Sequence, residues 1–93
     1  MNNNLNERAE AALAQAKAEI KGFFSAKKEP GKVSYMAVSR ITGIPNIGTC
    51  LTKKHVAALT LFKIAIGIEE ALKAADQDYE AAVKMRQNLF RWR

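Results

Sequence analysis

The side chains best able to do chemistry gather in residues 43–55, which read GIPNIGTCLTKKH and contain the only cysteine and the only histidine of the chain. A cysteine–histidine nucleophile needs a direct hydrogen bond between Cys50 and His55. Five residues along an α-helix turn the two side chains about 140° apart, so we do not expect them to touch. Two ligands also fall short of the roughly four that a zinc site needs. We therefore predict no metal site, with Cys50 as a small core residue and His55 partly exposed.

No other catalytic motif is present. The sequence lacks the Gly-x-x-x-x-Gly-Lys loop that cradles phosphates, the Gly-x-Ser-x-Gly turn of hydrolases and the His-Glu-x-x-His pair of zinc proteases. We predict that the protein is not an enzyme and has no cofactor. Its function then depends on what its surface binds.

The net charge of the chain is +6, and almost all of it lies in the middle of the sequence. Residues 30–68 contain five basic side chains and no acidic one, whereas residues 1–29 carry a net +1 and residues 69–93 a net of zero. A positive potential concentrated in this way favours polyanions such as nucleic acid. The five basic residues are Lys32, Arg40, Lys53, Lys54 and Lys63.

Residues 38–56 contain a motif that fits this charge. Apolar residues at positions 38, 41 and 44 precede a Pro-Asn-Ile-Gly hairpin, and a lysine-bearing helix start follows it. This pattern resembles the helix-hairpin-helix motif of DNA-binding proteins, in which two helices flank a Leu-Pro-Gly-Ile-Gly-like turn. The resemblance implies that backbone N–H groups of the hairpin and of the second helix hold a phosphate without reading base sequence. The residues expected to contact nucleic acid are Asn46, Ile47, Gly48, Thr49, Lys53 and Lys54, with Lys32 and Arg40 in support.

Two positions of the hairpin carry further expectations. Ile47 is expected to be the small apolar anchor between the two helices. Asn46 stands where the family has its first glycine, and asparagine adopts left-handed backbone conformations more readily than most residues. Gly43 is an additional helix breaker ahead of the hairpin.

Two other interpretations of the same residues stay open. In a helix-turn-helix, residues 34–42 would form the first helix and residues 49–59 the recognition helix, although a one-residue insertion is needed for Cys50 to fill the usual apolar position. In the simplest interpretation, the Pro-Asn-Ile-Gly segment is only a tight connection between helices, and the lysines beside it are solvated.

The elements that would position these residues are all helical. Apolar positions at helical spacing, many of them alanines, predict a first helix over residues 4–24. Residues 34–42 are expected to form a short helix with Ser34 as its N-cap and Gly43 at its left-handed end. A further helix is expected from about residue 49 to residue 68 or beyond, with Gly67 as a weak point, and a heptad-patterned helix over residues 69–93. Whether residues 49–93 form one, two or three helices stays open.

The composition sets the class of protein. Ninety-three residues suffice for one domain, residues 1–93, and we predict an all-α, compact bundle of three to five helices. The most apolar stretch, residues 56–68, is too short to span a bilayer and is expected to be a buried helix, so no membrane association is predicted. No secretion signal is evident and a single cysteine forms no internal disulfide, which favours a reducing, cytoplasmic setting.

A second class of function is a protein-binding module. The C-terminal segment KMRQNLFRWR is basic and aromatic, and Phe90, Arg91 and Trp92 are its candidate contact residues. Such a chain could act as a small inhibitor, of the kind that phages and plasmids encode, on a host complex that binds nucleic acid. The narrow alanine stripes also suit the pairing of two chains in a homodimer.

Overall fold

The computed structural model describes residues 2–53 and 56–89, and these residues are helical apart from the segments that connect the helices. Their only β-type pairing is an isolated bridge between Phe24 and Val33. The prediction of an all-α bundle of three to five helices is therefore confirmed. The helices are α1 (Asn2–Lys21), α2 (Tyr35–Thr42), α3 (Ile47–Thr52), α4 (Ala58–Ala74) and α5 (Glu80–Asn88).

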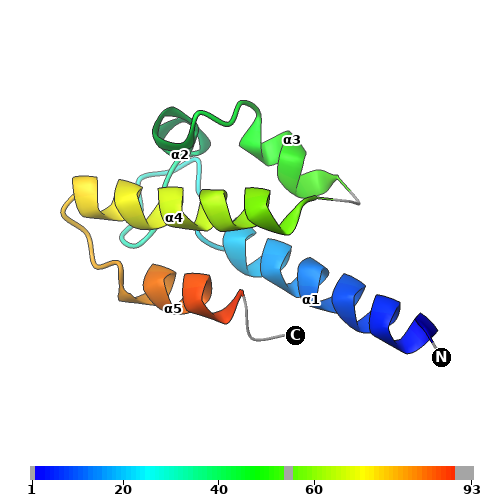
Figure 1. Cartoon of the computed structure of the whole chain (residues 1–93). Helices are drawn as coiled ribbons and strands as arrows, with labels where there is room; N and C mark the ends of the chain where they lie inside the picture. Colours follow the sequence, from blue (N-terminus) through cyan, green and yellow to red (C-terminus); the bar gives the residue numbers. More distant parts are fainter. Residues whose placement is uncertain (1, 54–55, 90–93) are drawn as a thin grey trace.

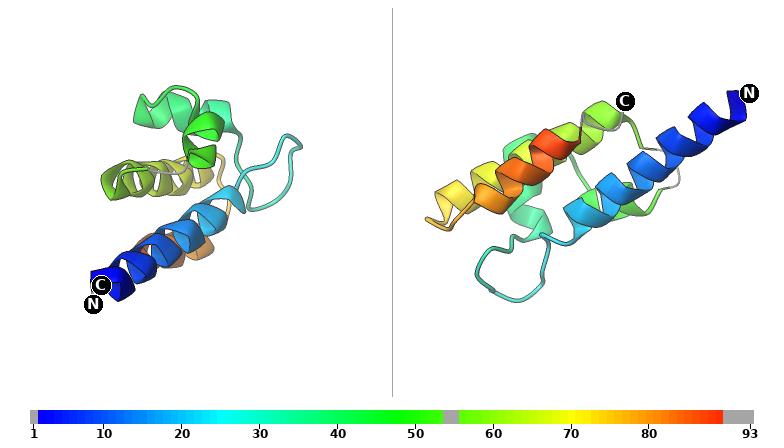
Figure 2. Two further views of the ribbon diagram at one scale, coloured as in Figure 1. Left: turned by 90° about the vertical axis from the view of Figure 1, so that its right-hand side faces the viewer. Right: turned by 90° about the horizontal axis from the view of Figure 1, so that it is seen from below.

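Helix α4 is the centre of the bundle. It lies between an upper layer, which we define as residues 35–52 (α2, α3 and the hairpin of residues 43–46 that joins them), and a lower layer of α1 and α5 (Figure 1). The side view shows the same order of layers and shows the α1–α2 loop extending away from the helices (Figure 2). The first half of α1 extends beyond the rest of the molecule (Figure 1).

The core is formed where the other helices cover α4. Helix α4 is covered on both sides and is apolar around much of its circumference, as expected for the buried helix in residues 56–68. Each of the other helices contributes at least one side chain to the same cluster. The largest fully buried side chains are Ile20, Val38, Ile47, Leu51, Leu61, Ile64, Ile68 and Leu72.

A helix does begin near residue 49, but it does not continue to residue 68, because α3 ends at Thr52 and α4 begins at Ala58. The Thr52 hydroxyl donates a hydrogen bond to the Thr49 carbonyl oxygen at 2.8 Å. Lys53 then takes an extended conformation, with φ −68° and ψ 144°. Hydrogen bonds from threonine hydroxyl groups to the backbone compete with the hydrogen bonds of the helix. The Thr52 bond lies at the end of α3.

Gly67 was expected to weaken the helix, and this expectation is also wrong. Helix α4 continues through Gly67 because α2 packs directly against that position. A β-carbon added there would lie 2.5 Å from Thr42 Cγ2 and 2.9 Å from Val38 Cγ1. The glycine therefore permits the close approach of two helices.

The expected helix over residues 69–93 is divided in the structure. Helix α4 ends in a Schellman motif, in which Asp76 has a left-handed φ of 58°. The Asp76 N–H donates to the Lys73 carbonyl at 3.0 Å, and the Gln77 N–H donates to the Leu72 carbonyl at 2.9 Å. Asp78 then accepts a hydrogen bond from the Glu80 N–H at 3.0 Å, which starts α5. Residues 56–89 thus contain two helices, α4 and α5, in place of one helix that continues from residue 69.

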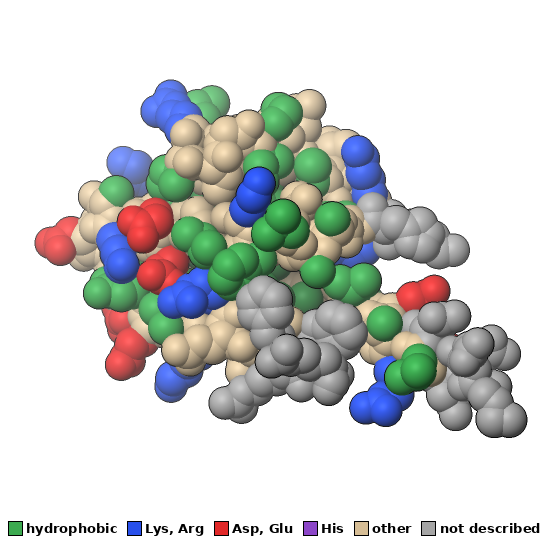
Figure 3. Space-filling view, in the orientation of Figure 1, with side chains coloured by type: hydrophobic (Ala, Val, Ile, Leu, Met, Phe, Trp, Pro, Cys, Tyr) green, Lys and Arg blue, Asp and Glu red, His purple; other side chains and the backbone are tan. Residues whose placement is uncertain are grey.

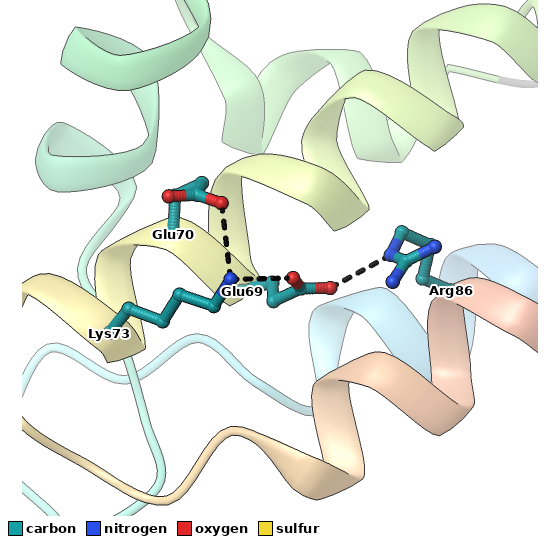
Figure 4. A network of polar contacts seen from close by, with 4 residues as sticks. All are labelled: Glu69, Glu70, Lys73 and Arg86. Carbon is teal, nitrogen blue, oxygen red and sulfur yellow. Dashed lines mark hydrogen bonds and ion pairs between the residues drawn. The ribbon is translucent and has the colours of Figure 1, made fainter.

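Glu69 joins α4 to α5 from a largely buried position (Figure 4). Its carboxylate accepts a hydrogen bond from Arg86 Nε at 2.8 Å and lies 3.3 Å from Lys73 Nζ. Burial acts to raise the pKa of Glu69, but the hydrogen bonds and charges of Arg86 and Lys73 outweigh it and leave that pKa lowered. Lys73 also lies 3.6 Å from the exposed Glu70 and 4.9 Å from the ring centre of Tyr79. A buried carboxylate placed between two cations is thus kept ionised.

The Gly67 contact makes a test of helix packing. Gly67→Ala should lower the free energy of unfolding by about 1 to 2 kcal/mol, because overpacking outweighs the gain in helix propensity. Adding Thr42→Ser removes the methyl group nearest to the new β-carbon and should restore most of the loss in urea denaturation. A Gly67→Ala protein more stable than the wild type would contradict this packing.

The Glu69 network predicts a dependence on pH. Glu69→Gln should lower the free energy of unfolding at neutral pH by about 1 to 3 kcal/mol, because two cations lose their partner. Since the folded pKa is depressed, the contribution of Glu69 is present above its ordinary pKa near 4.5 and is lost as the pH falls through the lower folded value. The difference between wild type and variant in urea denaturation should therefore shrink at acid pH.

Glu70→Gln is the matched control, because the Glu70 side chain is 49% exposed and pairs only with Lys73 among the described residues. Its effect should stay below about 0.5 kcal/mol. Equal losses in the two variants, or a Glu69→Gln effect that is unchanged at low pH, would contradict the role assigned to Glu69.

Candidate nucleic-acid interface

Helix α2 forms as its end residues predict. Ser34 lies in an extended conformation, and its hydroxyl oxygen accepts a hydrogen bond from the Ala37 N–H at 3.1 Å. At the other end, Gly43 has a φ of 75°, and its N–H donates to the Ser39 carbonyl at 2.8 Å. The predicted N-cap and the left-handed glycine are both confirmed, and the observed helix agrees with the expected residues 34–42 to within one position.

Side-chain hydrogen bonds hold the hairpin after α2. The Ser39 hydroxyl donates to the Ile44 carbonyl at 2.7 Å, and the Ile44 N–H donates to Thr42 Oγ1 at 3.2 Å. The Thr42 hydroxyl itself donates to the Val38 carbonyl at 2.8 Å. Two turns of α2 therefore hold the hairpin in place from one side, and Val38 and Thr42 are also the residues that pack against α4 at Gly67.

Asn46 reverses the chain and starts α3. It has a left-handed φ of 55° and ψ of 51°, as expected for the residue in place of a glycine, and its side chain makes no capping hydrogen bond. Ile47 follows and is buried, with 1% of its surface exposed, as expected for an apolar anchor. Gly48 lies next to Tyr35 at the start of α2, since a β-carbon on Gly48 would lie 3.7 Å from the tyrosine ring.

The start of α3 leaves backbone donors unused. The Cys50 N–H donates to the Asn46 carbonyl at 2.9 Å, but among the described residues the N–H groups of Ile47, Gly48 and Thr49 have no hydrogen-bond acceptor. Unpaired donors at a helix start are ordinarily solvated or bound by a capping group. A six-residue helix has a small dipole, so attraction of an anion to this surface depends on the charged side chains around it.

The upper layer contains no acidic side chain; its one charged residue is Arg40, and Lys53 follows directly after it. All nine acidic residues of the chain lie elsewhere: in α1, in the α1–α2 loop, in the C-terminal half of α4, in the turn after it and in α5. The space-filling view shows Lys and Arg but no Asp or Glu over α2 and α3 (Figure 3). The upper layer, residues 35–52, therefore lies within the part of the sequence, residues 30–68, that has no acidic side chain.

The basic residues singled out from the sequence do not all converge. Arg40 is exposed in the last turn of α2, next to the hairpin, with its Nη2 3.5 Å from Met36 Sδ. Lys53 is exposed immediately after α3. Lys32 lies before α2, in the α1–α2 loop, where its ammonium donates a hydrogen bond to the Gly22 carbonyl. Arg40 thus lies in the last turn of α2 and Lys53 directly after α3, whereas Lys32 lies before the start of α2.

Several candidate residues lie outside the described residues. These are Lys54 in the interface, His55 beside it, and the proposed partner-binding residues Phe90, Arg91 and Trp92. Cys50 is described; it is half-buried, with its Sγ 3.9 Å from the Pro45 carbonyl oxygen. No group of three metal-ligating side chains occurs among the described residues.

The helix-turn-helix interpretation is wrong in its recognition helix. That interpretation requires residues 49–59 to form one helix, but α3 stops at Thr52 and α4 starts at Ala58. The α3 that remains is too short to present the several base-contacting side chains of a recognition helix to the major groove.

The structure brings Lys17, a basic residue that the sequence did not single out as a contact, to the end of α3. Lys17 of α1 donates a hydrogen bond to the Lys53 carbonyl at 2.8 Å, across 36 positions of the sequence. Lys63 is exposed on α4. The acid-free run of residues 30–68 contains Lys63, so that signal was present in the sequence, whereas nothing in the sequence indicates that Lys17 reaches Lys53.

The comparisons with known proteins add no relative. No protein-family model, curated protein or solved structure matches the chain. Within the part of the chain that is described, no helix is both long enough and apolar enough to cross a membrane.

The left-handed residue of the hairpin makes a test of its geometry. Asn46→Ala should lower the free energy of unfolding by about 1 kcal/mol, because alanine adopts the left-handed conformation less readily than asparagine does. Asn46→Gly should be neutral or slightly stabilising in the same thermal or urea denaturation. If both variants are equally destabilised, the side chain of Asn46 rather than its backbone is what the fold requires.

Proposed function

We propose that this protein is a small, non-enzymatic nucleic-acid-binding protein that contacts backbone phosphates through its upper layer. The observation that carries the proposal is the absence of acidic side chains from residues 35–52, beside exposed Arg40 and Lys53. Among the described residues, neither cation has a carboxylate within ion-pair distance. A phosphate that approaches this layer is attracted by the two cations and is not repelled by a nearby carboxylate.

The hairpin supports the proposal in a second way. Its unused N–H groups at residues 47–49 are suitable donors to phosphate oxygens, and the motif resembles the helix-hairpin-helix turn that holds DNA phosphates. Ile47 contributes as the buried anchor that sets the position of those groups rather than as a contact. Phosphate contacts of this type carry no base sequence information, so the proposed binding is independent of sequence.

This proposal predicts a steep dependence on salt. If Arg40, Lys53 and Lys54 neutralise about two to three phosphates, the logarithm of the association constant should fall with the logarithm of salt concentration with a slope of about −2 to −3 on duplex DNA. Fluorescence anisotropy against labelled duplex and single-stranded probes of several sequences measures both the slope and the lack of sequence preference.

Matched charge reversals locate the surface. Arg40→Glu with Lys53→Glu should weaken binding by about tenfold or more at low ionic strength, because two phosphate contacts become repulsive. Arg8→Glu with Lys84→Glu changes the net charge equally, but these exposed residues lie on α1 and α5 in the lower layer. Equal losses in the two double variants, or no binding by the wild type to either probe at low salt, would overturn the proposal.

A protein partner is the second candidate, and exposed apolar side chains favour it. Met36 and Ile41 of α2 are 64% and 45% exposed, and Leu59 of α4 is 63% exposed. Methionine and arginine are both enriched at contact sites between proteins. Partner capture that is lost in Met36→Asp but kept in the Arg40→Glu, Lys53→Glu protein, together with no nucleic-acid signal, would support this candidate over the first.

A further inference from the structure

A groove separate from the hairpin lies between the α1–α2 loop and the C-terminal end of α4. Its volume is about 580 Å³. Ligand sites of proteins commonly have about 300 to 1,000 Å³, so the groove is large enough for a small molecule. The loop is closed at its base by the Phe24–Val33 bridge, in which the Val33 N–H donates to the Phe23 carbonyl at 2.8 Å and the Ser25 N–H to the Val33 carbonyl at 3.0 Å.

The floor of the groove is apolar and formed by small side chains. Ala37 of α2, Ala71 of α4 and Ala75 after α4 line it, together with the buried Val33. Larger side chains at the alanine positions would occupy this space. A shallow apolar floor of this kind suits the face of a flat ring.

The rim of the groove is basic. Lys27, Lys28 and Lys32 line it, against a single acid, Glu29. One hydrogen of the Lys32 ammonium is used by the Gly22 carbonyl, and an ammonium has three to donate. The net positive rim therefore favours an anionic group on the ligand.

Neutral donors complete the lining. The Ser25 hydroxyl oxygen accepts from the Lys27 N–H at 3.1 Å, and the Ser34 hydroxyl oxygen accepts from the Ala37 N–H at 3.1 Å. Each hydroxyl group also carries one hydrogen that it can donate to a ligand. Gln77 Oε1 accepts from the Gly31 N–H at 3.3 Å, which holds the loop to the turn after α4 and leaves the side-chain NH₂ as a donor.

We propose that this groove binds a phosphorylated ring compound of mononucleotide size. The ring lies on the alanine floor, and the phosphate lies at the lysine rim, within reach of the serine hydroxyl groups. The site shares no lining residue with the hairpin of residues 43–46, although Ala37 of the upper layer and Lys32 line it. Because Arg40, Lys53 and the hairpin lie outside the groove, the two proposals can be tested separately.

The probe is adenosine monophosphate (AMP), measured by isothermal titration calorimetry with the whole chain at low ionic strength. Adenosine and inorganic phosphate, each of which retains half of the recognised chemistry, should both bind more weakly than AMP. A short adenine oligonucleotide forms another arm: groove-dependent binding of AMP assigns a free nucleotide, and groove-dependent binding of the oligonucleotide alone assigns a nucleotide within a strand.

Two pairs of variants tie binding to the groove. Ala75→Leu fills the groove from an exposed position, whereas its neighbour Ala74→Leu is also exposed and does not line the groove. Lys27→Glu with Lys28→Glu reverses the rim, and Arg8→Glu with Lys84→Glu makes the same change of net charge on α1 and α5. The groove variants should weaken nucleotide binding by about tenfold or more, and their controls by less than about threefold.

Two results would overturn the proposal. One is the absence of a heat signal with both AMP and the oligonucleotide. The other is nucleotide binding that Ala75→Leu leaves unchanged while circular dichroism shows the variant folded. Because Lys53 and Arg40 are intact in all of these proteins, loss of nucleotide binding here is distinguishable from loss of the proposed hairpin contacts.

Discussion

The close approach of α2 to α4 at Gly67 is the contact on which the arrangement of the upper layer depends. Val38 and Thr42 occupy the space that a β-carbon on residue 67 would take. The same two residues also take part in the hydrogen bonds that lead into the hairpin, since Thr42 accepts from Ile44 and donates to Val38. One packing contact therefore sets where α2 lies and, through it, where the hairpin and α3 lie. The left-handed Asn46 and the buried Ile47 then fix the start of α3.

Acidic and basic side chains are distributed differently in the two layers. At the C-terminal end of α4, Glu69 pairs with Lys73 and with Arg86 of α5 from a buried position. In the upper layer no carboxylate is present, and Arg40 is left to solvent or to an external anion. A charge distribution of this kind has little effect on the fold, because exposed charges contribute little to stability, but it strongly affects which partners approach. This separation is the physical basis of the proposed binding to phosphates.

The elements whose ends are set by neighbouring residues could be predicted from the sequence. The elements that depend on contacts between distant parts of the chain could not. Ser34, Gly43 and Asn46 act within a few residues of themselves, so the short helix and its hairpin could be predicted. The ends of α3 at Thr52 and of α4 at Ala74 could not be predicted, because the alanine-rich and apolar residues around them favour a helix throughout. Each helix ends at a single turn, such as the one formed by the left-handed Asp76. The helical role of Gly67 and the Lys17–Lys53 contact depend on elements distant in sequence. Of the candidate interface, the acid-free layer could be predicted from the sequence, whereas the separation of Lys32 from Arg40 required the fold.

The central claim is that the upper layer contacts nucleic-acid phosphates through the hairpin. Backbone amide chemical shifts of the isotope-labelled protein, followed by NMR as a short duplex is added at low ionic strength, test it most directly. The account predicts that the largest shift changes fall on the N–H groups of residues 46–49 and on Arg40 and Lys53, and that they disappear as salt is raised. Shift changes confined to α1 and α5, or none in residues 35–53, would contradict it.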